Sequence, residues 1–500
     1  MSLLLELISR FRSTPDHRPW PRVTVDEAAW RLTAEYLALG RWSLLGLWGG
    51  TDVVHAAVLE GDDMAVLSFD CAARAFPSLA QHHAPALRLE RTIRDLWGLE
   101  PQGLTDRRPW LDHGRWVDHD PPGGGRRATT AGTGYRFLAA EGESLHEIPV
   151  GPVHAGIIEP GHFRFSASGE TVVRLEARLG YVHKGIERLM AGADPERASM
   201  LAGRCSGDST VAYGLAFARA TEAAAGIEAP ARAHWLRALL AELERLANHL
   251  GDIGAICNDA AFALMHTHCG VLRERVLRAA DACFGHRLMR DRIVPGGVTI
   301  DIDARQEEAI RALIVEIEHR FPALVELYDN TASLQDRTVG TGILTHQLAR
   351  QYAAGGYVGR AAGRGFDARR TPGYPPYDQL KFSVPVLPEG DVNARVWIRI
   401  REIEQSLTIV GQILDGLPSG SIRTHIPQTS GEGVALVEAF RGDVLVWIRL
   451  AEDGTVQRCH LRDPSWFQWP LLEAAIEGNI VADFPLCNKS FNCSYSGHDL

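Results

Sequence analysis

The chain has 500 residues, of which 45% are hydrophobic and 23% charged, and its formal net charge is −10. This composition is that of a globular protein with ample apolar material for a large core, and the length suggests about two to four domains. Acidic and basic residues are spread along the sequence, which argues against a nucleic-acid-binding protein, because such a protein carries a basic patch.

The first predicted elements form a small α+β unit over residues 1–117. Residues 27–39 and 83–99 have the periodicity of helices. Between them, residues 52–69 alternate in a way that favours a β-hairpin, turned at residues 60–63. Residues 118–135 follow, where DHDPPGGGRRATTAGTG (118–134) indicates a linker rich in proline and glycine.

The rest of the chain, residues 136–500, is predicted to be mainly helical. After a strand signal at 151–175, apolar stripes at 235–250 and 397–414 predict long helices. A third helix is expected at 307–328, kinked or broken by Pro322. Residues 434–461 return to strand alternation, with turns at 442–443 and 453–454. We therefore predict an α+β fold, in which a helical bundle with small β-sheets at its ends follows the small α+β domain.

Two further observations limit what this chain holds by itself. Its eight cysteines are too few for a disulfide scaffold and none forms a C-x-x-C pair, so we expect reduced thiols and no zinc or iron–sulfur site within the chain. The N-terminus lacks the apolar region of a signal peptide, and the most apolar stretch, residues 36–50, is too short to cross a bilayer. We expect a chain that is not inserted in a membrane, although it can sit on a membrane protein.

Several ordered motifs resemble one superfamily. The stretch HHAPALRLERTIRDLWGLEPQGL (82–104) resembles the small partner subunit that is called C in bacterial complex I. Resemblance to the large subunit of membrane-bound NiFe hydrogenases and complex I rests on GYVHKGIERL (180–189), GIEAPARAHWLRALLAELERLANHLGDIG (226–254), RERVLRAADACFGHRLMRDRIVPGGV (273–298), DRTVGTGILT (336–345), PYDQLKFSVPVLPEGDVNAR (376–395) and IREIEQSLTIVGQIL (400–414). Together they imply a fused C/D-type subunit of the group 4, formate hydrogenlyase-like class.

The nickel ligands of the hydrogenases are missing from this sequence. In those enzymes two C-x-x-C pairs supply four soft thiolates. The resemblance places the first pair on Ser206 and Ser209 and the second on Ser494 and Gly497. Hydroxyl groups are poor ligands for soft metals and glycine has no side chain, so a NiFe centre is not expected. Hydrogenase precursors also carry a C-terminal extension that is clipped after nickel insertion; none follows Leu500, unless it has already been removed.

Four residues close to these positions leave alternatives open. Cys205 and Cys493 each lie one residue before a ligand position, so they are either two small buried thiols or part of a residual metal site. Arg360 and Asp391 resemble charges on the wall of the family's cavity, and the structural alternative is a buried Arg–Asp pair.

Candidates for proton chemistry lie in GPVHAGIIEPGHFRF (151–165). The resemblance aligns Glu159 with a proton-passing glutamate, whose pKa a dry cavity would raise, and His154 with a histidine at the quinone headgroup. The alternative is that these residues shape a tight turn, which we favour for His162. Asp208 is either part of a proton path with Glu159 or, with Ser209, the cap of the helix that follows.

Basic residues supply candidates for electron–proton coupling. Arg245 and His249 are four residues apart, so they share one face of a helix. By resemblance that face approaches the terminal iron–sulfur cluster of the adjacent small subunit; alternatively they form a solvated pair. His183 and Lys184 open a second basic spot.

The resemblance implies a redox-coupling subunit of a membrane-bound respiratory complex. It would take electrons from a 4Fe-4S cluster in a neighbour to a quinone-like or other acceptor and link this to ion translocation. The implied partners are an iron–sulfur small subunit of the B type found in complex I, a ferredoxin-like subunit and the membrane arm, at the cytoplasmic face of the membrane. A NiFe hydrogenase with altered ligation and a non-catalytic scaffold are the alternatives. GRAAGRG (359–365) lacks the context of a dinucleotide-binding motif, so any NAD chemistry belongs to another subunit.

Overall fold

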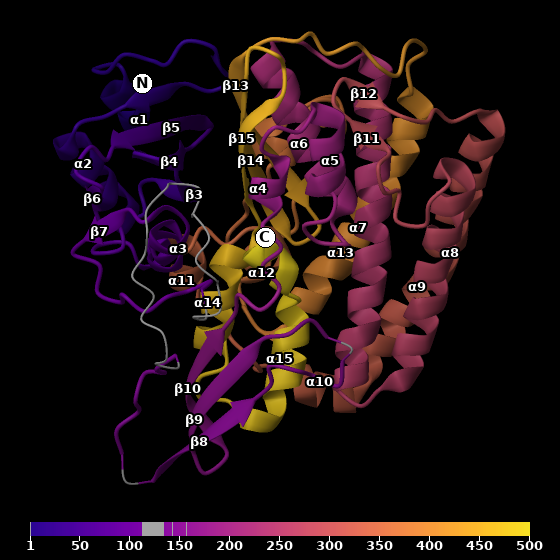
Figure 1. Ribbon diagram of the computed structural model, residues 1–500. Coiled ribbons are helices and arrows are strands. Elements are labelled where there is room, and N and C mark those ends of the chain that lie inside the picture. Colours follow the sequence, from indigo (N-terminus) through magenta and orange to yellow (C-terminus); the bar gives the residue numbers. More distant parts are fainter. Residues whose placement is uncertain (1, 113–134, 143, 157) are drawn as a thin grey trace.

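The computed structural model describes residues 2–112, 135–142, 144–156 and 158–500 (Figure 1). It has the mixed α+β fold that the sequence predicts. The predicted linker lies outside the described residues, except for Tyr135. No helix in the described part of the chain is both long and apolar enough to cross a membrane.

The N-terminal unit is built on a four-stranded sheet. The predicted hairpin is confirmed as β4 (Val53–Glu60) and β5 (Asp63–Asp70), and the strand order is β2-β5-β4-β3, with β2 at Arg22–Thr24 and β3 at Ser43–Gly49. The predicted helices are confirmed as α2 (Glu27–Ala38) and α3 (Leu87–Trp97), the latter after the 3-10 turn η1 (Ala84–Ala86). The unit is completed by α1 (Leu3–Ile8), β6 (Ala75–Pro77) and β7 (Glu100–Gln102).

Long helices form the second half of the molecule (Figure 1). The two apolar stripes become α7 (Ala231–Asp259) and α13 (Val392–Gly416), whose leucines and isoleucines are buried against each other's helix and its neighbours. Two more helices, α8 (Ala263–Phe284) and α9 (Ala304–Asn330), pack beside α7. Residue Pro322 lies inside α9 and does not end it, so the predicted break is absent.

A second sheet joins the two units. Its order is β1-β13-β14-β15, with β13 at Gly431–Ala439, β14 at Gly442–Leu450 and β15 at Val456–Arg462, which confirms the predicted strands and turns. Its edge strand β1 (His17–Arg18) comes from the N-terminal unit and pairs with β13 in parallel. Helix α6 (Thr210–Ala225) packs on β13 and β14.

The remaining elements surround this frame. A three-stranded sheet in the order β10-β9-β8 accounts for the strand signal near residue 160. The C-terminal tail ends in the middle of the molecule (Figure 1), where residues 497–500 are buried. These elements are β8 (Leu145–Val150), β9 (His162–Ser168), β10 (Thr171–Arg178), α4 (Ile186–Met190), α5 (Pro195–Ala202), β11 (Ile293–Val294), β12 (Gly297–Val298), α10 (Ala332–Thr338), α11 (His346–Gln351), α12 (Gly356–Ala361), η2 (Arg369–Gly373), α14 (Ser465–Ala475), η3 (Val481–Asp483), α15 (Phe484–Phe491) and α16 (Tyr495–Asp499).

Candidate functional site

The loop before α6 and the tail before α16 meet in a chain of hydrogen bonds. The N–H of Gly497 donates to Ser494 Oγ at 2.9 Å, and the hydroxyls of Ser494 and Ser206 are 2.9 Å apart. Ser206 in turn donates to Asp208 Oδ1 at 2.8 Å. The fold therefore brings together positions 206, 209, 494 and 497, and every serine hydroxyl among them has a polar partner.

The carboxylate of Asp208 is paired with Arg441, from the two-residue turn between β13 and β14. Arg441 Nη1 lies 2.7 Å from Asp208 Oδ1, and Nη2 donates to the second oxygen. Burial alone would raise the pKa of Asp208, but the guanidinium outweighs it and lowers the pKa to about 2. Gly356, at the start of α12, fixes the turn, because a Cβ there would lie 2.0 Å from the Arg441 carbonyl. The site therefore keeps a permanent ion pair at neutral pH.

Neither Asp208 nor Ser209 caps α6, so the capping alternative is wrong. Ser209 stands at the N-cap position without a side-chain hydrogen bond to the helix. The N–H groups of Val211 and Ala212 are instead accepted by the carboxylate of Glu244, from α7, at 2.7 and 3.1 Å. Asp208 is thereby left to bind Arg441.

A carboxylate stands where the fourth nickel ligand would be. A Cβ added at Gly497 would lie 2.5 Å from Asp463 Oδ2 and 2.9 Å from Ser494 Oγ. Asp463 is buried and held there, because Tyr213 donates to Oδ2 at 2.7 Å and the N–H of Ser465 to Oδ1 at 2.8 Å. Four convergent thiolates are thus replaced by hydroxyls, two carboxylates and a guanidinium, a set of hard groups that does not fit a NiFe centre.

The two neighbouring thiols are protonated. Burial raises the pKa of both Cys205 and Cys493 well above the usual range, and a neutral thiol is a poor metal ligand. In the described part of the chain, no three or more His, Cys, Asp or Glu side chains gather as a metal site would require.

The motif at 151–165 lies at the edge of this site. Glu159 is exposed in the isolated chain and accepts the N–H of Ser496 at 3.2 Å, so this chain alone does not place it in the expected dry cavity. Ring nitrogens of His154 and His162 donate to backbone carbonyls, His154 to Gly161 at 2.8 Å and His162 to Gly151 at 3.2 Å. Both imidazoles therefore hold the turn, and Glu159 reaches Ser494 only through the tail.

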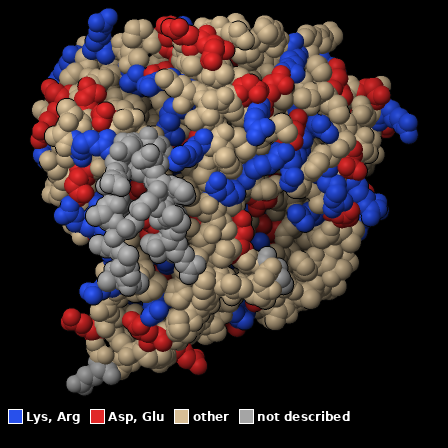
Figure 2. Space-filling model, viewed as in Figure 1, with Lys and Arg blue, Asp and Glu red and all other residues tan. Residues whose placement is uncertain are grey.

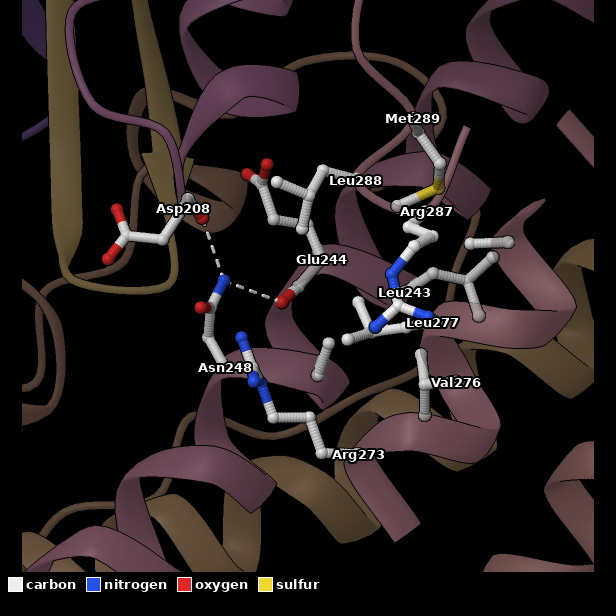
Figure 3. A pocket seen from close by; sticks show the side chains of 12 residues that line it. Asp208, Leu243, Glu244, Asn248, Arg273, Val276, Leu277, Arg287, Leu288 and Met289 are labelled. Carbon is white, nitrogen blue, oxygen red and sulfur yellow. Dashed lines mark hydrogen bonds between the residues drawn. The ribbon is translucent and has the colours of Figure 1, made fainter. Parts of the chain in front are cut away.

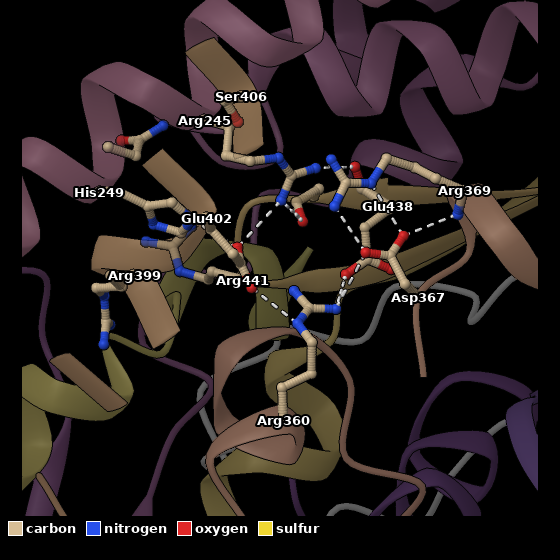
Figure 4. A network of polar contacts seen from close by, with 12 residues as sticks. Arg245, His249, Arg360, Asp367, Arg369, Arg399, Glu402, Ser406, Glu438 and Arg441 are labelled. Atoms are coloured by element: carbon tan, nitrogen blue, oxygen red, sulfur yellow. Dashed lines mark hydrogen bonds and ion pairs between the residues drawn. The ribbon is translucent and has the colours of Figure 1, made fainter. Parts of the chain in front are cut away.

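Next to the site lies a fully buried ionic network (Figure 4). Glu402, on α13, accepts from His249 Nε2 and from Arg360 Nε, each at 2.7 Å. The guanidinium of Arg245 lies 3.7 Å from the same carboxylate and 3.4 Å from Glu242. Because Arg245 and His249 are 1% and 0% exposed, the alternative of a solvated pair is wrong.

Arg360 lies at the centre of the network and does not pair with Asp391. It contacts Glu438 at 2.9 Å and Asp367 at 3.4 Å, besides Glu402. Asp391 instead caps α13, accepting the N–H of Ala394 at 2.7 Å. The buried Arg–Asp pair proposed as an alternative is therefore wrong.

The network binds a proton at one end. Burial, and then the charge of Asp367, raise the pKa of Glu438 to about 7. At the other end burial lowers the pKa of His249, while Arg360 and His249 hold the pKa of Glu402 well below its usual range. Phe440 separates this network from the site, with its ring 4.5 Å from the Arg441 guanidinium carbon and 6.1 Å from the His249 ring.

The second basic spot supports the C-terminal tail. His183 Nδ1 donates to the Asp499 carbonyl at 2.8 Å, and Lys184 Nζ lies 3.4 Å from the Cys205 carbonyl. The structure thus separates His183 and Lys184 from Arg245 and His249, which lie in the network.

Sequence reasoning missed Arg441, Asp463 and Glu402. Arg441 is 233 residues from Asp208, and no local spacing links them. The one available signal was that each is a charged residue beside a strongly apolar strand or helix, where an unpaired charge would be strongly destabilising.

Comparison with known proteins agrees with this geometry. Two family models match: "Respiratory-chain NADH dehydrogenase, 49 Kd subunit" over residues 259–430 and 422–499, and "Nickel-dependent hydrogenase" over 184–251. Hydrogenase-4 component G of Escherichia coli is 32% identical over 464 residues, covering 89% of this chain and 80% of that protein. The chain belongs to the family of large subunits shared by NiFe hydrogenases and respiratory complex I.

Other members of the family match in the same way. Formate hydrogenlyase subunit 5 of Escherichia coli is 31% identical over 438 residues, covering 85% of this chain and 77% of that one. A chain of the membrane-bound sulfane sulfur reductase, an archaeal respiratory membrane complex, superposes with a TM-score of 0.68 at 27% identity, covering 72% of this chain and 99% of that chain. These matches confirm the resemblance to fused hydrogenase-type large subunits. Members of the family are oxidoreductase subunits of membrane-bound complexes.

Proposed function

We propose that this chain is the redox-coupling subunit of a membrane-bound respiratory complex, and that its acceptor is reduced at the Asp208–Arg441 site without nickel. The observation that carries the proposal is the replacement of the four ligand positions by Ser206, Ser209, Ser494 and, at Gly497, the carboxylate of Asp463. Such groups bind a polar organic acceptor through hydrogen bonds, whereas they cannot hold soft metals.

Each group in the site has a chemical task. The Arg441 guanidinium, held by Asp208, is a fixed positive charge that stabilises negative charge developing on a reduced acceptor. The hydroxyls of Ser206 and Ser494 are aligned donors in a hydrogen-bond chain, so they can orient an acceptor oxygen or sulfur. Asp208 keeps the guanidinium in place, as a second carboxylate oxygen accepts from Nη2.

The acceptor class follows from the relatives. Complex I relatives point to a quinone, while the structural neighbour is a sulfane sulfur reductase. Electrons would come from a 4Fe-4S cluster in an iron–sulfur small subunit of the complex I B type. A ferredoxin-like subunit and membrane-arm subunits would complete the complex at the cytoplasmic face of the membrane. The face in Figure 2 has a hollow at its middle with acidic and basic side chains at its base, which a partner would cover.

The first test uses the purified intact complex. We expect no stoichiometric nickel and no hydrogen-dependent dye reduction, but reduction of a short-chain ubiquinone or an organic trisulfide with titanium(III) citrate as reductant. Arg441→Lys and Asp208→Asn should each lower this turnover roughly 100-fold, as loss of a charge-stabilising donor does. Arg305→Lys, on the exposed start of α9, is the matched control and should leave it unchanged.

Other results would decide against the proposal. Stoichiometric nickel and iron with hydrogen uptake would mean a hydrogenase with altered ligation. Full turnover in both Asp208→Asn and Arg441→Lys would mean that the chain is a scaffold and that the acceptor is reduced elsewhere.

A further inference from the structure

Glu244 is a buried carboxyl group without a cationic partner. Its side chain accepts the N–H groups of Val211 and Ala212 in the first turn of α6. The residue is 7% exposed, and in the described part of the chain no Lys, Arg or His forms an ion pair with it. A buried, unpaired carboxyl of this kind is difficult to ionise, so its protonation depends on its surroundings.

A pocket connects Glu244 with solvent between α7 and α8 (Figure 3). This α7–α8 pocket has a volume of about 310 Å³ including its open mouth, and its inner part has room for about one water molecule. Its lining also includes Asp208 and Asn248, whose side-chain amide donates to the backbone carbonyls of Asp208 and Glu244 at 2.8 and 2.9 Å. The pocket thus reaches from solvent to the loop that carries the site.

Two carboxyl groups of this region carry opposite charge states. Asp208 is ionised, because Arg441 lowers its pKa to about 2. Burial raises the pKa of Glu244 to about 8, and the negative charge of Asp208 raises it further. Of the cations nearby, Arg245 is turned into the buried network, while Arg273 and Arg287 line the pocket, Arg287 being paired with Glu274. Pairs of carboxyl groups with divergent pKa values are typical acid–base assignments.

We infer that Glu244 is the proton donor of the site and that the α7–α8 pocket is its connection to water. The inference rests on the proposed function, because it concerns the protons taken up when the acceptor is reduced. Electrons come from the reductant of the complex. For each proton delivered, Glu244 loses its O–H proton, the resulting carboxylate is held by the two N–H groups of α6, and water in the pocket returns a proton to it. Glu244 touches no acceptor, so it acts through the loop and its water.

The test measures turnover of the intact complex against pH, with titanium(III) citrate as reductant and short-chain ubiquinone or an organic trisulfide as acceptor. Wild-type turnover should fall as the pH rises through about 8, because Glu244 then loses its proton. Glu244→Gln keeps an acceptor for α6 but carries no transferable proton, so turnover should drop roughly 100-fold and lose this alkaline limb. Glu244→Asp should restore part of it. Glu308→Gln, an exposed carboxylate on α9, is the control.

A second measurement does not need turnover. Infrared spectra of the wild-type complex minus Glu244→Gln should contain the carbonyl band of one protonated carboxylic acid, which disappears as the pH is raised past about 8. The inference is overturned if that band is absent, or if Glu244→Gln keeps full turnover and the alkaline limb. Should Asp208→Asn and Arg441→Lys abolish turnover while Glu244→Gln does not, the inference fails and the proposed function stands.

Discussion

At the scale of single residues, the E-R-x-x-x-D signature of the N-terminal unit has a structural explanation. Glu90 accepts from Ser78 Oγ and the N–H of Leu79, both at 2.6 Å. Arg91 donates to the Arg108 carbonyl at 2.7 Å, and Asp95 accepts the N–H of Trp110 at 2.6 Å. All three signature residues are buried. They fix the loops beside α3 and do not form a binding site.

Glu90 gives a pH-dependent prediction. Burial raises its pKa to about 7, so the folded state holds this proton more tightly than the unfolded state, whose pKa is 4.5. The stabilisation is fully present below about pH 4.5 and is lost as the pH rises to about 7, a change of about 3 kcal/mol in the free energy of unfolding. Glu90→Gln, which mimics the protonated form, should remove this loss.

The measurement is urea unfolding followed by tryptophan fluorescence, at about pH 5 and about pH 8. Stability that falls equally in wild type and Glu90→Gln would contradict the prediction. Glu35→Gln, on the exposed face of α2, is the control and should keep the wild-type dependence.

At the scale of elements, the contact between α6 and β13 sets the position of the site. Helix α6 follows the loop with Ser206 and Asp208, and β13 leads into the turn with Arg441. The two elements approach closely through glycine: a Cβ on Gly433 would lie 2.0 Å from the Ala220 carbonyl, and one on Gly431 would lie 2.1 Å from the Ala224 carbonyl. The strand glycines thus serve helix–sheet packing.

Gly433→Ala should therefore separate α6 from β13. Because the contact is with backbone, no side-chain rotation relieves it, and we expect a loss of about 1–3 kcal/mol in the free energy of unfolding. Acceptor turnover should fall with it, since Asp208 and Arg441 move apart. Urea midpoints and turnover of the assembled complex check both effects.

Gly270→Ala is the matched control on α8, where an added Cβ meets nothing within 4 Å. It should stabilise the helix by up to about 1 kcal/mol. If Gly433→Ala behaves like Gly270→Ala, close packing of α6 on β13 does not govern the site.

At the scale of the whole molecule, the two units share one structure. The hydrophobic core of the N-terminal unit continues into the large unit through Trp110, Phe163 and Tyr495. Arg22 binds Glu432 with two hydrogen bonds, of 2.7 and 3.0 Å, and the Trp48 ring stacks on His460 at 4.8 Å. An interface with buried aromatic and arginine anchors is typical of permanent association.

Separately expressed fragments 2–112 and 135–500 should therefore co-purify as one complex. Trp48→Ala and Arg22→Met should each weaken the association by at least roughly 30-fold, as loss of a central anchor does. Arg31→Met, in a surface ion pair on α2, should not. Fragments that fail to associate, or that tolerate both anchor changes, would contradict this account. Pull-down followed by titration calorimetry measures both.

The sequence by itself determined the elements and the family. Periodicity in α7 and α13, and alternation in β13 to β15, are local patterns that the fold keeps, because each element buries one apolar face. Absence of cysteine at 206, 209, 494 and 497 is likewise visible in the sequence alone. Pro322 was misjudged, since α9 continues through it.

Only the tertiary structure decided the partners of the charged residues. Local reasoning paired Asp208 with the helix beside it and Arg360 with Asp391, whereas the fold pairs them with Arg441 and Glu402. A buried charge binds whichever opposite charge the packing of distant elements brings within reach, and sequence spacing carries no record of this. For the same reason, Asp463 opposite Gly497 and Glu244 beneath α6 emerged only once the chain was folded.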